Sequence, residues 1–294
     1  MAQRFREVPA VSVLDHRLVQ SHDYAIINPL QVDISMWDDL DTSAVVPRTF
    51  KDQSELFPRL IDLNALSFER RVALVEQSED WARSHDQPML SALLKSDAPR
   101  DRVVQHFAHA MHMRRDGRDR VFRFYDPRVF QHLQWLFDPA QMKALLGPLD
   151  TWTWCTAAGD WKSCAKPEVT TTVLHIHADQ WPILLRMEDI NVVLAALADV
   201  MPSLVMEQKL VRRIDDLLVE SSHAWRMTAP DDRQLFAFQA IRFHPRIHTH
   251  LVLKSKLALV LDGKQSYVSA CADLDDVAML QLAAETAPNY KDDP

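Results

Sequence analysis

Glycine is scarce in this sequence. Only four glycines occur in 294 residues, at positions 117, 147, 159 and 263. They lie too far apart to build a glycine-rich phosphate loop, a dinucleotide-binding turn or a nucleophile elbow, because each of these needs several closely spaced glycines. The sequence therefore excludes the nucleotide-binding enzymes and serine hydrolases that depend on such loops.

Cysteine and long apolar runs are scarce as well. The cysteines form an odd and sparse set, typical of a reducing compartment and unable to provide a disulfide framework. They are Cys155, Cys164 and Cys271. No run approaches the roughly 18 apolar residues that cross a bilayer, and residues 1–13 carry charges where a signal peptide has an apolar core. We therefore expect a cytoplasmic protein with reduced thiols and no membrane partner.

The charge balance argues against nucleic acid as a partner. The formal net charge is −8, whereas broad binding to phosphate backbones relies on clustered lysine and arginine. The rest of the composition, with 47% hydrophobic and 25% charged residues, is that of an ordinary folded protein. At this length we expect two lobes.

Strands and helices alternate over the first half of the sequence. Strand-like apolar runs occupy residues 24–27, 59–63, 89–94 and 121–125. Helical spacing fills the intervals, and we expect Gly117 to end the helix that begins near residue 97. Asp126-Pro127 and Asp138-Pro139 each supply an N-cap and a first-turn proline, the second as part of a capping box. The pattern predicts an α/β or α+β lobe over 24–148, with helices covering a sheet.

The pattern changes after Pro148. Tryptophans flank a turn at 158–160, which predicts a hairpin within a connector over 149–180. A strand is predicted at 169–176 and a loose polar tail at 288–294. Helical spacing of apolar residues then occurs at 189–200, 203–223, 231–243 and 274–287, and residues 252–261 fit a strand or a helix. We expect a mainly helical C-terminal lobe over 181–290.

Four motifs in a fixed order connect the sequence to a known family. They are Leu60-Ile61-Asp62-Leu63, residues 90–97, residues 120–129 and Leu145-Leu146-Gly147-Pro148. Together they resemble the type VI secretion adaptor family, the Tap proteins or effector chaperones, whose shared domain has long been catalogued as of unknown function. The resemblance covers roughly 24–161. It implies a non-catalytic protein that binds an effector toxin and loads it onto the VgrG spike. The missing glycine loops, together with the incomplete metal signature described below, predict that it holds no cofactor.

The third motif and the helix after it supply the candidate partner-binding residues. They are Arg123, Tyr125, Asp126, Arg128 and Trp135. Two interpretations stay open, since the charged members either form a structural ion pair and helix cap or contact a partner. Adaptors that serve different toxins meet a similar machine. We therefore expect the lobe with the motifs to face the spike and the helical lobe to bind the cargo.

A metal-dependent hydrolase is the alternative interpretation. His175, His177 and Asp179 have the H-x-H-x-D spacing of metallo-β-lactamase-type hydrolases, in which a metal-bound water becomes the nucleophile. Gln180 stands where that signature has its last histidine, so the signature is incomplete. Further candidate ligands, none at a standard zinc spacing, are His244, His248 and His250, and Cys155 with Cys164 across the predicted hairpin.

A permanent structural subunit of the secretion apparatus is a third class. A subunit and an adaptor both rely on protein contact surfaces, so the sequence does not separate them. Stoichiometry separates them, because an adaptor would be absent from purified assembled particles and a subunit would remain.

Overall fold

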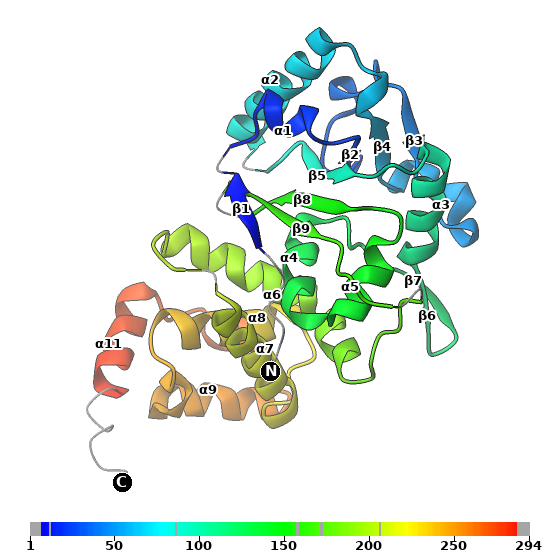
Figure 1. Ribbon diagram of the computed structural model, residues 1–294. Coiled ribbons are helices and arrows are strands. Elements are labelled where there is room, and N and C mark those ends of the chain that lie inside the picture. The colour runs from blue at the N-terminus through cyan, green and yellow to red at the C-terminus, as the bar shows by residue number, and fades with distance from the viewer. Residues whose placement is uncertain are drawn as a thin grey trace. The chain divides into compact units, whose positions relative to one another are not determined.

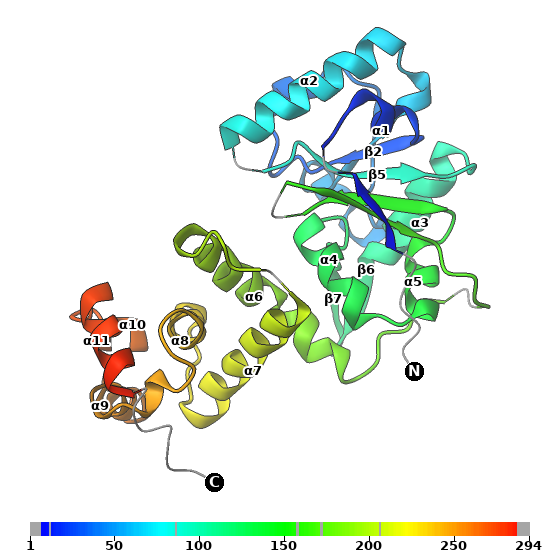
Figure 2. The same ribbon diagram turned by 60° about the vertical axis from the view of Figure 1, so that its left-hand side comes forward.

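The chain forms two compact units in a computed structural model, shown in Figures 1 and 2. The first unit runs to Ile176 and the second begins at His177. The structure describes residues 7–286, except 12, 86, 157, 158, 171, 172 and 206. Within these residues, none of the helices has the length and apolar character needed to span a membrane.

A seven-stranded antiparallel sheet forms the centre of the first unit. Its strands lie in the order β1-β9-β8-β5-β2-β4-β3. Their bounds are β1 (Glu7–Val11), β2 (Tyr24–Ile27), β3 (Thr42–Ala44), β4 (Arg59–Asp62), β5 (Leu90–Lys95), β8 (Thr151–Cys155) and β9 (Trp161–Ala165). In the middle of the sheet, Tyr24 of β2 lies opposite Asp62 on one side and Leu94 on the other. The antiparallel pairing of every strand makes this unit α+β.

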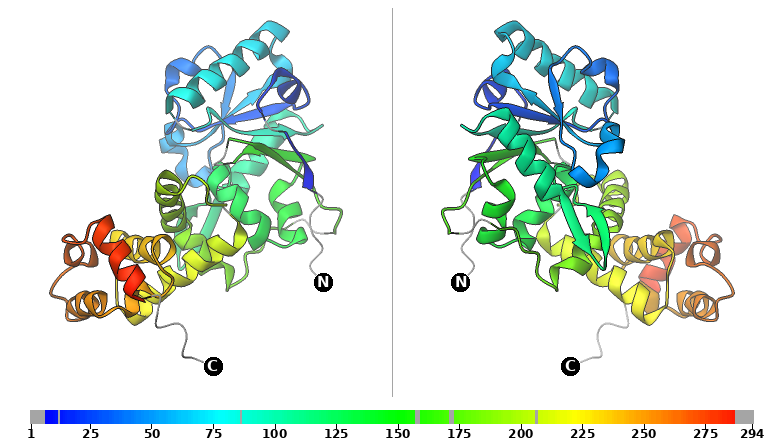
Figure 3. Two further views of the ribbon diagram at one scale, coloured as in Figure 1. Left: turned by 90° about the vertical axis from the view of Figure 1, so that its left-hand side faces the viewer. Right: turned by 90° about the vertical axis from the view of Figure 1, so that its right-hand side faces the viewer.

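Helices cover both faces of this sheet (Figures 2 and 3). One face carries α1 (His16–Gln20) and α2 (Phe68–His85), and the other carries α3 (Arg100–Met111), α4 (Pro127–Leu136) and α5 (Pro139–Leu146). All four residues of β2 are buried. Ala25 and Ile27 of β2 share a core cluster with Leu74 and Trp81 of α2. Coverage on both faces explains why the central strands appear in the sequence as continuous apolar runs.

The predicted helix starts at the two aspartate-proline pairs are confirmed. The Asp126 carboxylate accepts a hydrogen bond from the backbone N–H of Arg128 at the start of α4. Asp138 and Gln141 form a capping box at the start of α5, with distances of 2.8 and 2.9 Å. In both helices the proline occupies the first turn, where its missing N–H costs nothing.

The segment between α3 and α4 differs from the prediction. The helix ends at Met111, and the chain then forms a two-stranded hairpin of β6 (His112–Arg115) and β7 (Arg118–Val121), which projects from the end of α3 (Figure 1). The prediction that Gly117 ends the helix is wrong. Gly117 and Asp116 instead form the hairpin turn, with φ of 73° and 53°. Two successive positive φ values are the signature of the type I′ turn that suits the twist of a hairpin.

Two predicted strands are also wrong. Residues 122–125 connect β7 to α4 without forming a strand. The described residues of 169–176 do not form a strand either. In the first segment, the consecutive residues Phe124 and Tyr125 are both buried. A strand would send these neighbours to opposite faces, whereas this irregular segment packs both into the protein.

The predicted tryptophan hairpin is present as β8 and β9. Both strands belong to the central sheet, because β8 pairs with β5 and β9 pairs with β1. The sequence boundaries placed this hairpin in a connector at 149–180, whereas the compact units divide between Ile176 and His177. Hydrogen bonding to strands far away in the sequence leaves no trace in local periodicity, so the sequence offered no sign that this hairpin extends the sheet.

The second unit is helical in its described residues. Its helices are α6 (Gln180–Val200), α7 (Gln208–Ala224), α8 (Pro230–Arg242), α9 (Leu251–Leu261), α10 (Tyr267–Ala270) and α11 (Asp276–Thr286). Residues 252–261, ambiguous in the sequence, form most of α9. The predicted fold class, a sheet covered by helices followed by a mainly helical lobe, is confirmed. The predicted tail at 288–294 lies outside the described residues.

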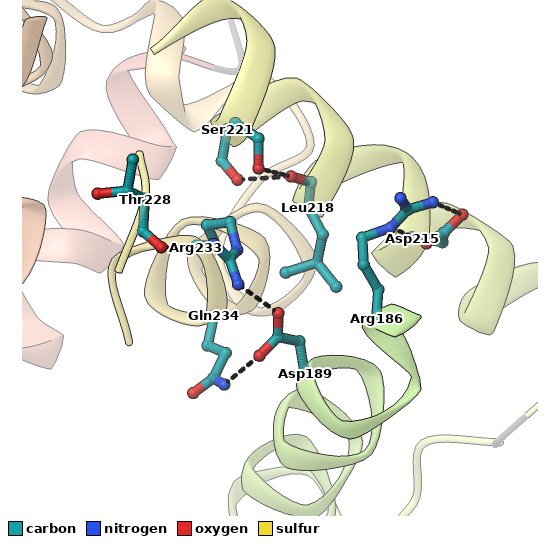
Figure 4. A network of polar contacts seen from close by, with 9 residues as sticks. Arg186, Asp189, Asp215, Leu218, Ser221, Thr228, Arg233 and Gln234 are labelled. Carbon is teal, nitrogen blue, oxygen red and sulfur yellow. Dashed lines mark hydrogen bonds and ion pairs between the residues drawn. The ribbon is translucent and has the colours of Figure 1, made fainter. Parts of the chain in front are cut away.

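A polar network ties α6 to both α7 and α8 (Figure 4). Asp189 of α6 is buried and accepts hydrogen bonds from Arg233 Nη2 and Gln234 Nε2 of α8, both at 2.8 Å. One turn earlier, Arg186 makes a bidentate pair with Asp215 of α7 at 2.7 and 3.0 Å. Charge-assisted bonds of this kind compensate buried carboxylates for lost hydration. They therefore specify which faces of the three helices meet.

Candidate protein-interaction site

A cluster of aromatic rings anchors the motif at residues 120–129. Phe124 and Phe130 are fully buried, and their ring centroids lie 5.7 and 4.6 Å from that of Trp152 on β8. Phe107 of α3 completes the cluster, 5.5 Å from Phe124 and 5.6 Å from Trp152. Such ring pairs contribute about 1 kcal/mol each beyond the area they bury. The apolar members of the motif therefore fix α4 and the segment before it on the sheet.

Asp126 and Arg128 form a helix cap and an ion pair. Besides the backbone N–H of Arg128, the Asp126 carboxylate accepts from Nε of that side chain at 3.0 Å and from Nη2 at 2.7 Å. The Asp126 side chain is 6% exposed and the Arg128 side chain 57% exposed. The carboxylate is therefore a structural group, whereas one side of the guanidinium remains open to solvent.

Tyr125 and Arg123 lie together beside this pair. Tyr125 is 1% exposed, and burial raises the pKa of its phenol while the nearby Arg123 opposes that rise. The guanidinium carbon of Arg123 lies 6.0 Å from the centre of the Tyr125 ring, at the outer limit of a cation–π contact. The Arg123 residue itself is exposed. The tyrosine thus supports an arginine that is accessible from outside.

Trp135 lies near the end of α4, where it is half-buried. Its ring meets that of His132, three residues earlier, edge to face at 6.1 Å. Of the five candidate residues, only Arg123 and Arg128 are exposed. A partner that contacts this motif would therefore meet guanidinium groups, with the buried members holding them in place.

Gly147 in the fourth motif has a steric role. Its φ is +56°, and a Cβ added at this position would lie 2.1 Å from the His106 ring of α3. That ring is fixed by a hydrogen bond from His106 Nε2 to the Leu145 carbonyl, at 2.8 Å. Burial lowers the pKa of His106, which favours the neutral ring. The glycine thus allows the end of α5 to pack closely against α3.

The β6–β7 hairpin places more arginines next to the motif. Six arginines and three aspartates lie between residues 112 and 128, in a chain whose formal net charge is −8. Sequence reasoning missed this hairpin because its strands are charged and lack the alternation of apolar residues that a sheet packed on a core requires. The dipeptide Asp116-Gly117 was the available signal, since Asp-Gly favours a type I′ hairpin turn.

The alternative metal ligands do not form a metal site. Among the residues that the structure describes, no group of three or more His, Cys, Asp or Glu side chains could hold a metal ion. His175, His177 and Asp179 are each exposed and do not form such a group. The strand that was expected to present them is absent from the described residues of 169–176.

The other candidate ligands have different surroundings. His248 is buried and stacks on Phe236 with ring centroids 3.6 Å apart. His250 instead contacts Glu285, at 3.1 Å. The two cysteines expected to face each other do not do so, because Cys164 lies opposite Trp152 and Cys155 lies opposite Trp161. Burial raises the pKa of both thiols to about 11, so they are protonated at neutral pH.

Comparison with known families identifies part of the first unit. Residues 45–144 match the family described as "Domain of unknown function (DUF4123)". The chain carries a DUF4123 domain. DUF4123 is the domain of the type VI secretion effector chaperones and adaptors, so the resemblance seen in the motifs is confirmed. Searches of curated proteins and of solved structures gave no significant match.

The DUF4123 match covers about a third of the chain. It contains β4, β5, the helices α2 to α4, the β6–β7 hairpin and most of α5. Strands β2 and β8 lie outside the match although they flank β5 in the sheet. Trp152 is also outside, so the aromatic cluster of the DUF4123 domain is completed by a residue that follows the matched segment.

Proposed function

We propose that this protein is a cytoplasmic, non-catalytic adaptor that binds a type VI secretion effector and loads it onto the VgrG spike. The observation that carries the proposal is the DUF4123 domain at residues 45–144. The structure of the motif agrees with a binding role, because Phe124 and Tyr125 are buried and its three arginines are exposed. Such a site presents charge on a rigid support and lacks the convergent acid, base or nucleophile of a catalytic centre.

A deletion strain tests this function. Without the adaptor, the effector should be less abundant or less soluble in the cell and should not reach the recipient. Complementation with the full chain should restore both. The loading step is checked by co-purification, since the full chain should retain both the effector and VgrG from its host. Unchanged effector abundance together with unchanged delivery would exclude an adaptor role.

We assign the spike contact to the first unit, because its DUF4123 domain is the part shared with other adaptors. Arg123→Glu tests this assignment. The variant Arg128→Glu is unsuitable, since it would place a second carboxylate beside Asp126 and destabilise the cap. The expected result is loss of VgrG from the pull-down with the effector retained and the melting temperature unchanged. A matched control is Arg17→Glu on α1, another exposed arginine of the same unit, which should keep both partners.

We assign the cargo contact to the helical second unit. Apolar side chains exposed on α6 support it, among them Leu185 (51%) and Val192 (45%), which lie seven residues apart on one side of the helix. A partner segment with apolar side chains binds such a face because contact removes the apolar side chains of both from water. Replacing both with serine should release the effector and leave VgrG bound. Release of VgrG alone would reverse the assignment of the two units.

A further inference from the structure

The β6–β7 hairpin has two faces with different charge. Side chains alternate between the faces of a two-stranded sheet, and residues opposite each other in register share a face. His112 lies opposite Val121, and Arg114 lies opposite Asp119. On this first face Asp119 is the acid opposite Arg114, and its carboxylate accepts a hydrogen bond from His112 Nε2 at 3.0 Å.

The second face carries three arginines and no acidic residue of either strand. Its members are Met113, Arg115, Arg118 and Arg120, and we call it the arginine face. Arg115 lies directly opposite Arg118, and Met113 lies opposite Arg120. Asp116 in the turn, 3.4 Å from Arg115, is the nearby acid. In the described part of the chain the exposed side chains of Arg118 and Arg120 form no hydrogen bond or ion pair.

The three arginines concentrate positive charge on one face of the hairpin. Like charges directly opposite each other destabilise a strand pair, and a two-stranded sheet is only marginally stable to begin with. Nothing in the packing requires arginine at these positions, because Arg118 and Arg120 are exposed. The arrangement becomes favourable when an anionic segment lies across the face and neutralises it.

We propose that the arginine face binds an acidic segment of a protein partner. Guanidinium groups form bidentate bonds with the carboxylates of aspartate and glutamate, and Met113 between them offers an apolar contact. Nucleic acid is the less suitable anion, because the protein as a whole carries a net charge of −8 and would repel a phosphate backbone. The inference rests on the proposed function in one respect, namely that the partner is a component of the secretion pathway.

The experiment uses the full chain and a fluorescein-labelled Glu-Ser repeat peptide as the probe. Binding is followed by fluorescence polarisation at low ionic strength for the wild type and for Arg118→Gln/Arg120→Gln. The matched control is Arg17→Gln/Arg102→Gln, which removes two exposed arginines of the same unit outside the hairpin. We expect the hairpin variant to bind at least about fivefold more weakly, as the loss of two exposed charge pairs implies, and the control to bind like the wild type.

Two further measurements exclude loss of folding as the explanation. The hairpin variant should melt at the wild-type temperature, since the exposed Arg118 and Arg120 make no hydrogen bond or ion pair in the described part of the chain that the substitution would remove. The charge-reversed variant Arg118→Glu/Arg120→Glu should bind a Lys-Ser repeat peptide that the wild type does not bind. Equal binding of the Glu-Ser peptide by wild type and hairpin variant overturns the proposal, as does preferential binding of a short duplex DNA.

This outcome is separable from that of the proposed function. If the deletion strain loses effector delivery while the hairpin variant binds the acidic peptide normally, the adaptor role stands and the arginine face is not the contact. If the peptide binding depends on Arg118 and Arg120 but delivery is unaffected by deletion, the arginine face stands and the adaptor role does not.

Discussion

The stability of the second unit should fall as the pH is lowered, because of His248. Its ring stacks on Phe236 of α8, with ring centroids 3.6 Å apart, and lies edge-on to Tyr267 of α10, with ring centroids 6.1 Å apart. Its Nε2 is buried and has no hydrogen-bond partner among the described residues. Burial first, and the charge of Arg213 second, lower the pKa of His248 to about 3. The ring is therefore neutral in the folded protein.

The magnitude follows from the two protonation equilibria. In the unfolded chain the same histidine titrates at its ordinary pKa of 6.5. Between pH 6.5 and about pH 3 the unfolded state binds a proton at this histidine and the folded state does not. The free energy of unfolding therefore decreases as the pH falls through this window. By pH 5 the loss relative to pH 7 is ~2 kcal/mol, which is a large fraction of the stability of an ordinary domain.

The assay compares wild type with His248→Phe by urea denaturation at pH 7 and at pH 5. Phenylalanine keeps an aromatic ring against Phe236 and cannot be protonated. Buried His22 and half-buried His106 in the first unit also have lowered pKa values, but they contribute equally to both proteins. The wild type should lose ~2 kcal/mol more than the variant between the two pH values. An identical pH dependence in the two proteins would refute the assignment of a neutral, buried His248.

Substitutions at three further positions test the steric and polar features described above by the same denaturation assay. Gly147→Ala should cost roughly 2 kcal/mol, because it combines a strained φ with a contact against the His106 ring; a neutral result would show that α5 can move away from α3. Asp126→Ala should cost about 1–2 kcal/mol through loss of the cap, and Asp126→Asn less, since asparagine also caps; equal losses would assign the effect to the charge pair. Asp189→Ala should cost about 3 kcal/mol by leaving Arg233 without its carboxylate partner, and a loss below about 1 kcal/mol would mean that water replaces it.

Local signals predicted much of the fold. Proline after aspartate located the starts of α4 and α5, because an N-cap and its hydrogen bonds involve neighbouring residues only. The central strands were found for a similar reason, since strands buried on both faces leave continuous apolar runs. The helices of the second unit followed from their apolar periodicity, and α9 was ambiguous because it is apolar on several sides.

Long-range pairing and irregular burial could not be predicted in the same way. The partners of β8 and β9 are β5 and β1, and no local pattern encodes that choice. The segment before α4 has aromatic residues like a strand, yet it is held by rings from α3 and β8. At the candidate site, the sequence located the motif but did not separate its buried Asp126 and Tyr125 from its exposed Arg123. Exposure depends on the packing of distant elements.

The pairing of β1 with β9 has a consequence for the synthesis of this protein. Glu7 lies opposite Cys164. The N-terminal strand β1 therefore cannot join the sheet until β9 has been synthesised and has left the ribosome. A nascent chain that ends with the DUF4123 segment exposes Phe107, Phe124 and Phe130 without Trp152 to cover them. Contacts this distant in sequence form slowly, and exposed apolar rings favour aggregation in the interval. The first unit is therefore most vulnerable to misfolding while it is still being translated, well before it meets any partner.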